Sequence, residues 1–380
     1  MAAAPLRAQA APAARPVRAR AWLKRLHLWF GLSAGLAFAL VALSGTALAF
    51  QRELLLWQHP ELRRPLPDRA QLAAVLDTLG GAARPAGLTA LDLPTPALPV
   101  WQLYFADGAR RYLDPQTGAL LLTRTPSNDA LLWLRELHTH LLAGARGEQV
   151  LGGVGLLALF LLLSGLWLWW PRRGALLSSL RPHAQPPTRR WLSWHRSLGA
   201  LALPLLLTVT ATGTAMVYHA PTRAALRAAF ADAPEPAPPP LLVPQARPFD
   251  WNATLAAAEA ALPGAALRRL VLPGARDAKV AIRAQAAGER HPVGRSVIWL
   301  DPYRGRVLGV RDATRQGAGA RMSDNIYPLH MGAAGGGAWR ALVALAGLLP
   351  SLLLVSGFLF WRARKRAARG GIAAQRRCRR

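Results

Sequence analysis

Four histidines occupy matching positions in two halves of the chain, and their residue type and spacing are suited to metal chemistry. A shift of 168 residues places His27 on His195, and a shift of 192 residues places His138 on His330. The neutral imidazole is a common ligand of zinc, copper and iron. A single histidine near the end of an apolar segment is usually an interfacial polar residue, but paired recurrence favours a metal-binding role.

The other ligand types in the sequence narrow the choice of metal. The one cysteine, Cys378, excludes a disulfide framework, zinc ribbons, Cys-ligated iron–sulfur clusters and the C-x-x-C-H attachment of c-type haem. Zinc takes three or four protein ligands, whereas each aligned pair offers two. Haem iron accepts two axial imidazoles, and the apolar macrocycle supplies its other ligands. The pairs are therefore predicted to hold haem, two haems in all or one if a pair does not converge.

The elements that must position these histidines are four membrane-spanning helices. Four segments stay apolar long enough to cross a bilayer, which takes about 20 residues. We place the helices at residues 22–50, 150–171, 191–220 and 338–361, with tryptophans clustered near their ends as in interfacial belts. Soluble modules at residues 51–149 and 221–337 lie between them. The fold class is thus an α-helical integral membrane protein, a four-span bundle of two tandem repeats, each with an α+β module.

The distribution of charge orients the spans. The net charge is +28, and residues 1–25, 172–196 and 362–380 hold 21 basic residues and no acidic one. All 19 acidic residues lie in residues 51–148 and 220–337. By the positive-inside rule, the termini and the 172–190 loop are cytoplasmic, and both modules face the opposite side of the membrane. The high charge therefore indicates orientation and not nucleic-acid binding.

The position of each histidine along its span separates the two pairs. His27 and His195 each lie 18 residues before the glycine of a Ser/Thr-Gly pair, near the cytoplasmic ends of their spans. His138 and His330 lie 27 residues before the equivalent glycine, about 40 Å of helix, at the outer face. Glycines that follow them are expected to break the helix and fold each histidine back toward the bundle. These are Gly144, Gly147, Gly152 and Gly153 after His138, and Gly332 and Gly335–Gly337 after His330.

Other polar and small residues leave alternatives open. The glycines of spans one and three either pack helices closely or make room for a porphyrin; they are Gly31, Gly35, Gly45, Gly199 and Gly213. His140 and His219 are reserve ligands without a histidine at the equivalent position. Arg135 and Arg340 either pair with haem propionates or an anionic substrate, or anchor the interface. The loop histidines His59, His183 and His291 are predicted to be solvated.

Each module is predicted to be a small α+β unit. Candidate strands cover residues 98–105 and 296–300, and Asp-Pro-x-x-Gly turns at 114–118 and 301–305 suit hairpins. Amphipathic helices are predicted over residues 71–80 and 252–262. The proline-rich residues 234–244 form a polyproline spacer. The basic residues 1–21 and the Arg-rich tail 362–380 are predicted to be disordered near anionic lipid.

The chain resembles the PepSY-associated transmembrane family, which includes iron-regulated inner-membrane proteins and ferric-siderophore reductases. The matching motifs are residues 26–31 (LHLWFG), 136–138 (ELH), 166–173 (LWLWWPRR), 194–199 (WHRSLG) and 328–332 (PLHMG). The turns at 114–118 and 301–305 are similar to the PepSY strand–turn pattern, and the resemblance covers residues 20–365. It implies a helical bundle with periplasmic PepSY-like modules and, as in characterised reductases, b-type haem that carries electrons to a periplasmic ferric chelate.

The leading functional expectation is a haem-containing inner-membrane reductase. Electrons enter at His27 and His195, cross to His138 and His330, and reduce a periplasmic acceptor such as a ferric siderophore. The donor is a quinol or a cytosolic reductase, because no dinucleotide-binding fingerprint follows a strand. The alternative is a non-enzymatic, membrane-anchored PepSY protein that aids iron uptake and whose histidines are structural. A transporter is less favoured, because no span carries a midplane charge.

Overall fold

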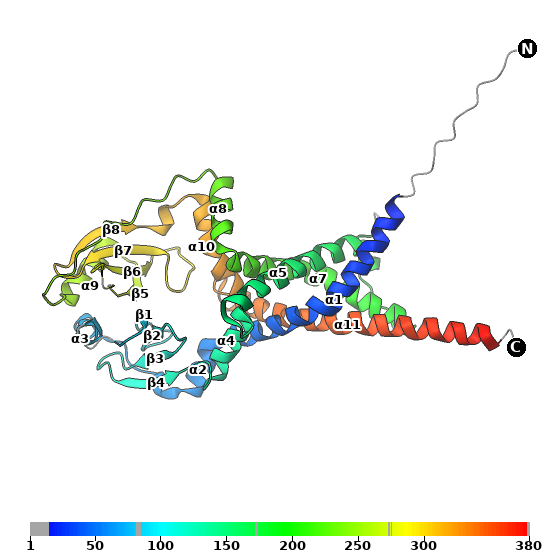
Figure 1. Cartoon of the computed structure of the whole chain (residues 1–380), viewed down its shortest axis with the longest axis horizontal. Helices are drawn as coiled ribbons and strands as arrows, with labels where there is room; N and C mark the ends of the chain where they lie inside the picture. The colour runs from blue at the N-terminus through cyan, green and yellow to red at the C-terminus, as the bar shows by residue number, and fades with distance from the viewer. Residues whose placement is uncertain (1–14, 81–84, 172–173, 273, 275, 378–380) are drawn as a thin grey trace, which may run out of the picture. The chain divides into compact units, whose positions relative to one another are not determined.

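Four long helices of the computed structural model match the predicted spans (Figure 1). The structure describes residues 15–80, 85–171, 174–272, 274 and 276–377. Within them, α1 (Arg15–Leu48), α5 (Gly144–Trp169), α7 (Pro187–Val217) and α11 (Gly336–Arg377) contain the four segments that are long and apolar enough to cross a membrane. The chain is an integral membrane protein by these helices, each of which exceeds the length that a bilayer requires.

The shorter elements lie between these four helices. The remaining helices are α2 (Gln51–Gln58), η1 (Pro60–Leu62), α3 (Arg69–Gly80), α4 (Ala130–His140), α6 (Leu176–Ser179), α8 (His219–Ala229), α9 (Trp251–Ala261), η2 (Ala313–Arg315) and α10 (Ala318–His330). The strands are β1 (Leu88–Asp92), β2 (Trp101–Phe105), β3 (Arg110–Leu113), β4 (Leu120–Arg124), β5 (Ala266–Val271), β6 (Val280–Gln285), β7 (Ser296–Asp301) and β8 (Arg306–Arg311). The two expected hairpin turns connect β3 to β4 and β7 to β8, and the expected amphipathic helices are α3 and α9.

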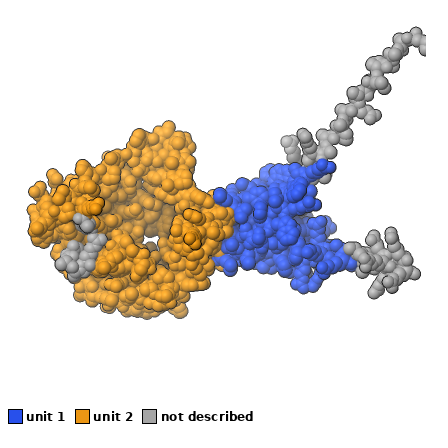
Figure 2. Space-filling model, viewed as in Figure 1, with its two compact units in different colours: residues 1–40, 156–207, 349–380 blue, residues 41–155, 208–348 orange. Residues whose placement is uncertain are grey.

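The chain forms two compact units (Figure 2). Unit 1 comprises residues 1–40, 156–207 and 349–380, and unit 2 comprises residues 41–155 and 208–348. In unit 1, three glycines lie where helices meet. A side chain on Gly31 would meet Leu161 at 3.9 Å, one on Gly35 would meet Leu354 at 3.6 Å, and one on Gly199 would meet Leu353 at 3.6 Å. These are ordinary van der Waals distances, so an alanine would also fit at each of the three positions.

The described strands of unit 2 form one antiparallel sheet in the order β4-β3-β2-β1-β5-β6-β7-β8. The sequence predicts two separate modules, but the structure joins their strands where β1 pairs with β5. The reason is the apolar pattern of both edge strands. Leu91 of β1 lies opposite Leu270 of β5, and both are fully buried. An unpaired edge with these side chains would expose backbone groups and apolar surface, so pairing is favoured.

One hydrophobic core joins the two halves of the sheet. Alternate residues of the inner strands point to α3 and α9, because successive side chains of a strand face opposite sides. Trp101 of β2, Val280 of β6 and Leu300 of β7 are buried in the same cluster as Leu76 of α3 and Leu255 of α9. The opposite face carries polar residues and a smaller apolar cluster that includes Leu55, Val100 and Tyr112.

A substitution at the junction of β1 and β5 should destabilise unit 2. Leu270→Ala leaves a cavity in the core and should lower the free energy of unfolding by about 2–5 kcal/mol. Chemical denaturation followed by tryptophan fluorescence measures this change, since Trp101 and Trp251 are buried in the same core. Leu120→Ala on β4 is the control, because Leu120 is 58% exposed, and it should change stability by less than about 0.5 kcal/mol. Equal losses from both variants would contradict the joined core.

The termini differ from the expected disorder where the structure describes them. α1 begins at Arg15, so the prediction for residues 1–21 is wrong over residues 15–21, and α11 continues to Arg377 through the predicted tail. Alanine, arginine and lysine are strong helix formers, and these segments extend helices that already exist. The rest of both predictions, including Cys378, lies outside the described residues. Residues 234–244 contain no helix or strand, as expected of a spacer.

Candidate functional site

The first histidine pair lies in unit 1. His27 of α1 and His195 of α7 face each other, with ring centres 6.3 Å apart and ring planes at 87°. The sequence places them 168 residues apart, so the contact comes from the packing of two spanning helices. The structure brings together the two residues that the first shift aligns.

The second pair lies in unit 2. His138 near the end of α4 and His330 at the end of α10 have ring centres 6.1 Å apart and planes at 41°. Both α4 and α10 precede a spanning helix, and both are separated from it by a tight turn. The structure therefore also brings together the residues that the second shift aligns.

Backbone turns place the second pair, as the glycines after it predict. Leu141 and Leu142 after α4 have positive φ angles of 49° and 60°, and Gly332 after α10 has a φ of 88°. A side chain on Gly147 would lie 1.6 Å from the carbonyl oxygen of His140, an approach that only glycine permits. The predicted break is confirmed at Gly144 and Gly332, which have positive φ angles, whereas Gly147, Gly152 and Gly153 lie within α5 and do not break it.

All four imidazoles are oriented in the same way by their Nδ1 atoms. Nδ1–H of His138 donates to the Val41 carbonyl at 2.9 Å, and that of His195 donates to the Leu353 carbonyl at 3.0 Å. His330 donates in the same way to the Val209 carbonyl at 3.0 Å, and Nδ1 of His27 lies 2.8 Å from the Ser164 hydroxyl. No Nε2 atom of the four has a hydrogen-bond partner among the described residues. Each Nε2 lone pair is thereby left for a metal.

The Ser/Thr-Gly pairs form the seats of these rings. Each pair lies on a spanning helix opposite one histidine, and its hydroxyl lies within 3.3 Å of Nδ1. The seats are Ser44-Gly45 for His138, Ser164-Gly165 for His27, Thr212-Gly213 for His330 and Ser356-Gly357 for His195. The sequence contains the signal, since the four dipeptides align in the repeat, but their partnership with histidines is a tertiary contact. Sequence reasoning missed the four hydroxyls and the two glycines of the other spans, Gly165 and Gly357, as site residues.

The glycine of each seat makes room for the ring. A Cβ atom on Gly213 would lie 2.7 Å from Cε1 of His330, and one on Gly45 would lie 2.9 Å from Cε1 of His138. On Gly165 it would lie 3.2 Å from His27. Of the glycines that the sequence left open between packing and cofactor, Gly45 and Gly213 therefore border the histidines.

The geometry of both pairs fits two axial ligands of one metal. An imidazole nitrogen binds a metal at about 2.0 Å, so two rings on opposite sides of one iron have centres about 6 Å apart. Burial lowers the pKa of His330 to about 4 and also lowers the pKa of His138, which keeps both rings neutral. Within the described part of the chain, no three His, Cys, Asp or Glu side chains are placed so that they could hold a metal ion together. A group that supplies its own equatorial ligands, as haem does, fits this donor set.

The four histidines differ in the number of hydrogen-bond partners at Nδ1, which predicts different losses of metal binding when a seat hydroxyl is removed. Nδ1 of His27 has only the Ser164 hydroxyl as a partner among the described residues, whereas His138, His195 and His330 each have a carbonyl as well. Ser164→Ala should therefore weaken metal binding at its pair about 10–100-fold, the usual effect of removing such a partner. Ser356→Ala is the matched control and should cost less, because the Leu353 carbonyl still fixes His195. Titration of haem into the purified variants measures both, and equal losses would contradict the assignment.

The reserve ligands lie away from both pairs. Nδ1 of His140 is 3.2 Å from a Glu136 carboxylate oxygen and 2.7 Å from the Thr139 hydroxyl, and His219 begins α8 as an exposed residue. His59 bonds Glu61 at 2.9 Å. None of these contacts involves His138 or His330.

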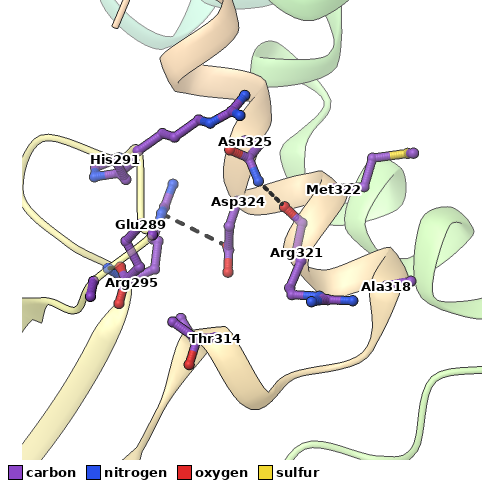
Figure 3. Close-up of a pocket in the computed structure, with 13 residues that line it drawn as sticks. Glu289, His291, Arg295, Thr314, Ala318, Arg321, Met322, Asp324 and Asn325 are labelled. Carbon is purple, nitrogen blue, oxygen red and sulfur yellow. Dashed lines mark hydrogen bonds and ion pairs between the residues drawn. The ribbon is translucent and has the colours of Figure 1, made fainter. Parts of the chain in front are cut away.

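His291 corrects the prediction that the loop histidines are solvated. It is 8% exposed, and its ring stacks on Tyr327 with centres 5.0 Å apart. Figure 3 shows it beside Arg295 and Asp324 in a cavity of about 540 Å³. Both carboxylates of this cavity have partners within the chain. Asp324 forms an ion pair with Arg295 at 3.8 Å, and Glu289 accepts a hydrogen bond from the backbone N–H of Ser296. His291 is buried because its ring packs on Tyr327 of α10, whereas neighbouring residues such as Gly288 and Arg290 are exposed.

Arg135 and Arg340, which the sequence left open, both line a second cavity of unit 2, of about 840 Å³. Arg340 also forms an ion pair with Glu53 and lies over the ring of Phe50.

A comparison with protein families agrees with this architecture. The model of the PepSY-associated TM region matches residues 24–364, a range that includes all four spans and both histidine pairs. No curated protein matches the chain.

Proposed function

Because the chain belongs to the PepSY-associated TM family of membrane proteins, we propose that it is a haem-containing reductase of the bacterial inner membrane. In this proposal it moves electrons from the cytoplasmic side to a periplasmic acceptor, most plainly a ferric siderophore. The observation that carries the proposal is the state of the four histidines. The ring centres of the two pairs lie 6.3 and 6.1 Å apart, and among the described residues each of the four Nδ1 atoms has a hydrogen-bond partner while no Nε2 atom does.

The repeat and its orientation are part of the proposal. Each half contributes the same series: a spanning helix, a helix and four strands of the sheet, a short helix ending near a histidine, and a second spanning helix. The basic residues of the termini and of residues 172–196 support cytoplasmic placement of those segments. His27 and His195 then form the inner site, and His138 and His330 form the outer site.

The residues of the chain would bind and orient the cofactor. Haem supplies the one-electron chemistry when bound. His27, His195, His138 and His330 would hold the haem, and the carbonyls or hydroxyls at Nδ1 orient each ring. Hydrogen bonds at Nδ1 also make an imidazole a stronger electron donor to iron, which influences the reduction potential.

The choice of a ferric siderophore as electron acceptor is supported by the chemistry of iron chelation. Siderophore oxygens are hard donors that bind Fe(III) far better than Fe(II), so a one-electron reduction loosens the metal. Quinol is one candidate donor: it loses two electrons and two protons, which suffices for two ferric ions. A cytosolic reductase is the other candidate.

Purified protein tests the proposal directly. We expect a reduced-minus-oxidised spectrum of b-type haem, a haem-to-protein ratio of about two, and the low-spin ferric signal of two axial imidazoles. Protein that is folded but binds no haem, even when haem is supplied, would reject the reductase. In that case the histidines serve as interhelical hydrogen-bond donors, as the non-enzymatic accessory function requires.

A further inference from the structure

The polar face of the sheet in unit 2 follows from strand alternation. On β2, Trp101 and Leu103 are buried in the core against α3 and α9, while Gln102 and Tyr104 line the cavity of about 840 Å³. On β6, Arg283 lines the same cavity between core residues. Since neighbouring side chains of a strand face opposite sides, the sequence dictates one apolar and one polar face. The cavity lies on the polar face.

The lining of this cavity is strongly basic. Among the described residues, nine arginines line it, against two carboxylates, Glu53 and Asp92. Both carboxylates are already neutralised, because Asp92 accepts two hydrogen bonds from Arg269 and Glu53 pairs with Arg340. The remaining charge has to be balanced by something other than these carboxylates.

Five of the arginines have no carboxylate partner in the part of the chain that the structure describes: Arg52, Arg110, Arg135, Arg268 and Arg283. They come from α2, β3, α4, β5 and β6, so both halves of the chain contribute to the cavity. Such a gathering of unpaired cations is costly without an anion, because like charges repel strongly where water is scarce. A built site for an anionic ligand accounts for the arrangement.

The titration behaviour of neighbouring groups agrees with a positive potential. Burial and then Arg135 lower the pKa of Arg110, and burial and then Arg52 lower that of Arg268. The pKa of His291 falls to about 3, through burial and the nearby arginines 295, 283 and 269. A positive field of this kind raises the local concentration of anions.

We propose that this cavity binds a ferric chelate of net negative charge, whose iron is held by carboxylate or catecholate oxygens. The inference rests on the proposed reductase function and names its substrate class. Guanidinium groups bind carboxylates in bidentate fashion, and the volume falls in the range of about 300–1,000 Å³ that small-ligand sites occupy. A neutral or cationic hydroxamate chelate would leave the arginines unpaired.

The cavity adjoins the outer histidine pair. Arg135 precedes His138 on α4 by less than one helical turn, and Met331 and Gly332, which follow His330, line the cavity. A chelate held here would therefore lie next to the outer site. The same carboxylate chemistry could come from haem propionates, which would be expected to use Arg135 first. Arg110 and Arg283 lie on strands of the sheet, so their substitution distinguishes binding of a chelate from binding of haem propionates.

Binding of gallium(III) citrate to the full-length protein as purified tests the inference. Gallium mimics Fe(III) in charge and size but is not reduced, so calorimetry reports binding without any reductase activity. We expect Arg110→Gln and Arg283→Gln each to weaken binding about tenfold or more, the usual effect of losing a charge-assisted hydrogen bond. Arg306→Gln is the matched control, because Arg306 is an exposed residue at the start of β8 outside the cavity. Binding should also weaken as salt is raised.

The outcomes separate this inference from the proposed function. Equal affinity for a neutral gallium trihydroxamate, or unchanged citrate affinity in Arg283→Gln, would overturn the inference. Loss of haem from Arg110→Gln and Arg283→Gln would overturn it too, since the arginines would then serve the propionates. Protein that binds gallium citrate through these arginines but cannot reduce ferric citrate would keep the inference and reject the reductase.

Discussion

Replacing His330 with alanine should remove one haem of two. The substitution deletes one axial ligand of the outer pair and leaves His27 and His195 in unit 1 untouched. The haem-to-protein ratio should fall from about two to about one. Changes around a ligand typically cost about 10–100-fold in activity, so loss of the ligand itself should slow reduction of a ferric chelate by more than that. Absorbance spectra and stopped-flow reduction with a quinol analogue measure both quantities.

Two further variants make this prediction specific. His140→Ala removes a histidine that bonds Glu136 and Thr139, and it should retain both haems. His330→Met offers a thioether ligand in place of imidazole, so it should retain haem with a raised reduction potential. If His330→Ala keeps two haems with an unchanged axial-ligand signal, the outer site is assigned to the wrong residues.

The helices and the pairing of the histidines were open to prediction from sequence because both are encoded locally or by repetition. An apolar run and an Asp-Pro-x-x-Gly turn determine structure within a few residues, and α1, α5, α7 and α11 follow from this. The repeat then identifies which histidines are equivalent. Equivalence in two halves is a strong hint of proximity, and the contact of His138 with His330 bears it out.

The features that sequence reasoning missed all depend on long-range contacts. The Val41 carbonyl lies 97 residues from His138 in the sequence, and no sequence pattern predicts the hydrogen bond between them. The pairing of β1 with β5 unites two halves that each have a complete helix-and-strand pattern. His291 is buried because its ring packs on Tyr327 of α10, although the surrounding loop is polar. The basic cavity arises only when arginines from separate elements of both halves face one space.

The seat glycines provide the most direct test that ring position, and not merely histidine content, creates the outer site. Gly213→Ala places a methyl group 2.7 Å from Cε1 of His330, closer than side chains approach one another. The ring has to move, but its Nδ1–H is held by the Val209 carbonyl, so displacement breaks that bond and turns Nε2 away. We expect this single methyl group to release most of the outer haem, as a deletion of the ligand would.

A series of glycine variants predicts an order of effects that structural damage alone would not produce. The distance from the added methyl group to the ring increases from Gly213 through Gly45 (2.9 Å) and Gly165 (3.2 Å) to Gly357 (3.4 Å), so haem loss should decrease in that order. Gly153→Ala is the control, since nothing lies within 4 Å of its new methyl group; alanine should also favour α5 at that position. Haem content, measured for the five variants at equal folded fraction, tests whether haem loss follows this order of distances. If Gly213→Ala retains haem as well as Gly153→Ala does, the imidazole of His330 does not need its seat to bind a metal, and the assignment of the Ser/Thr-Gly pairs is wrong.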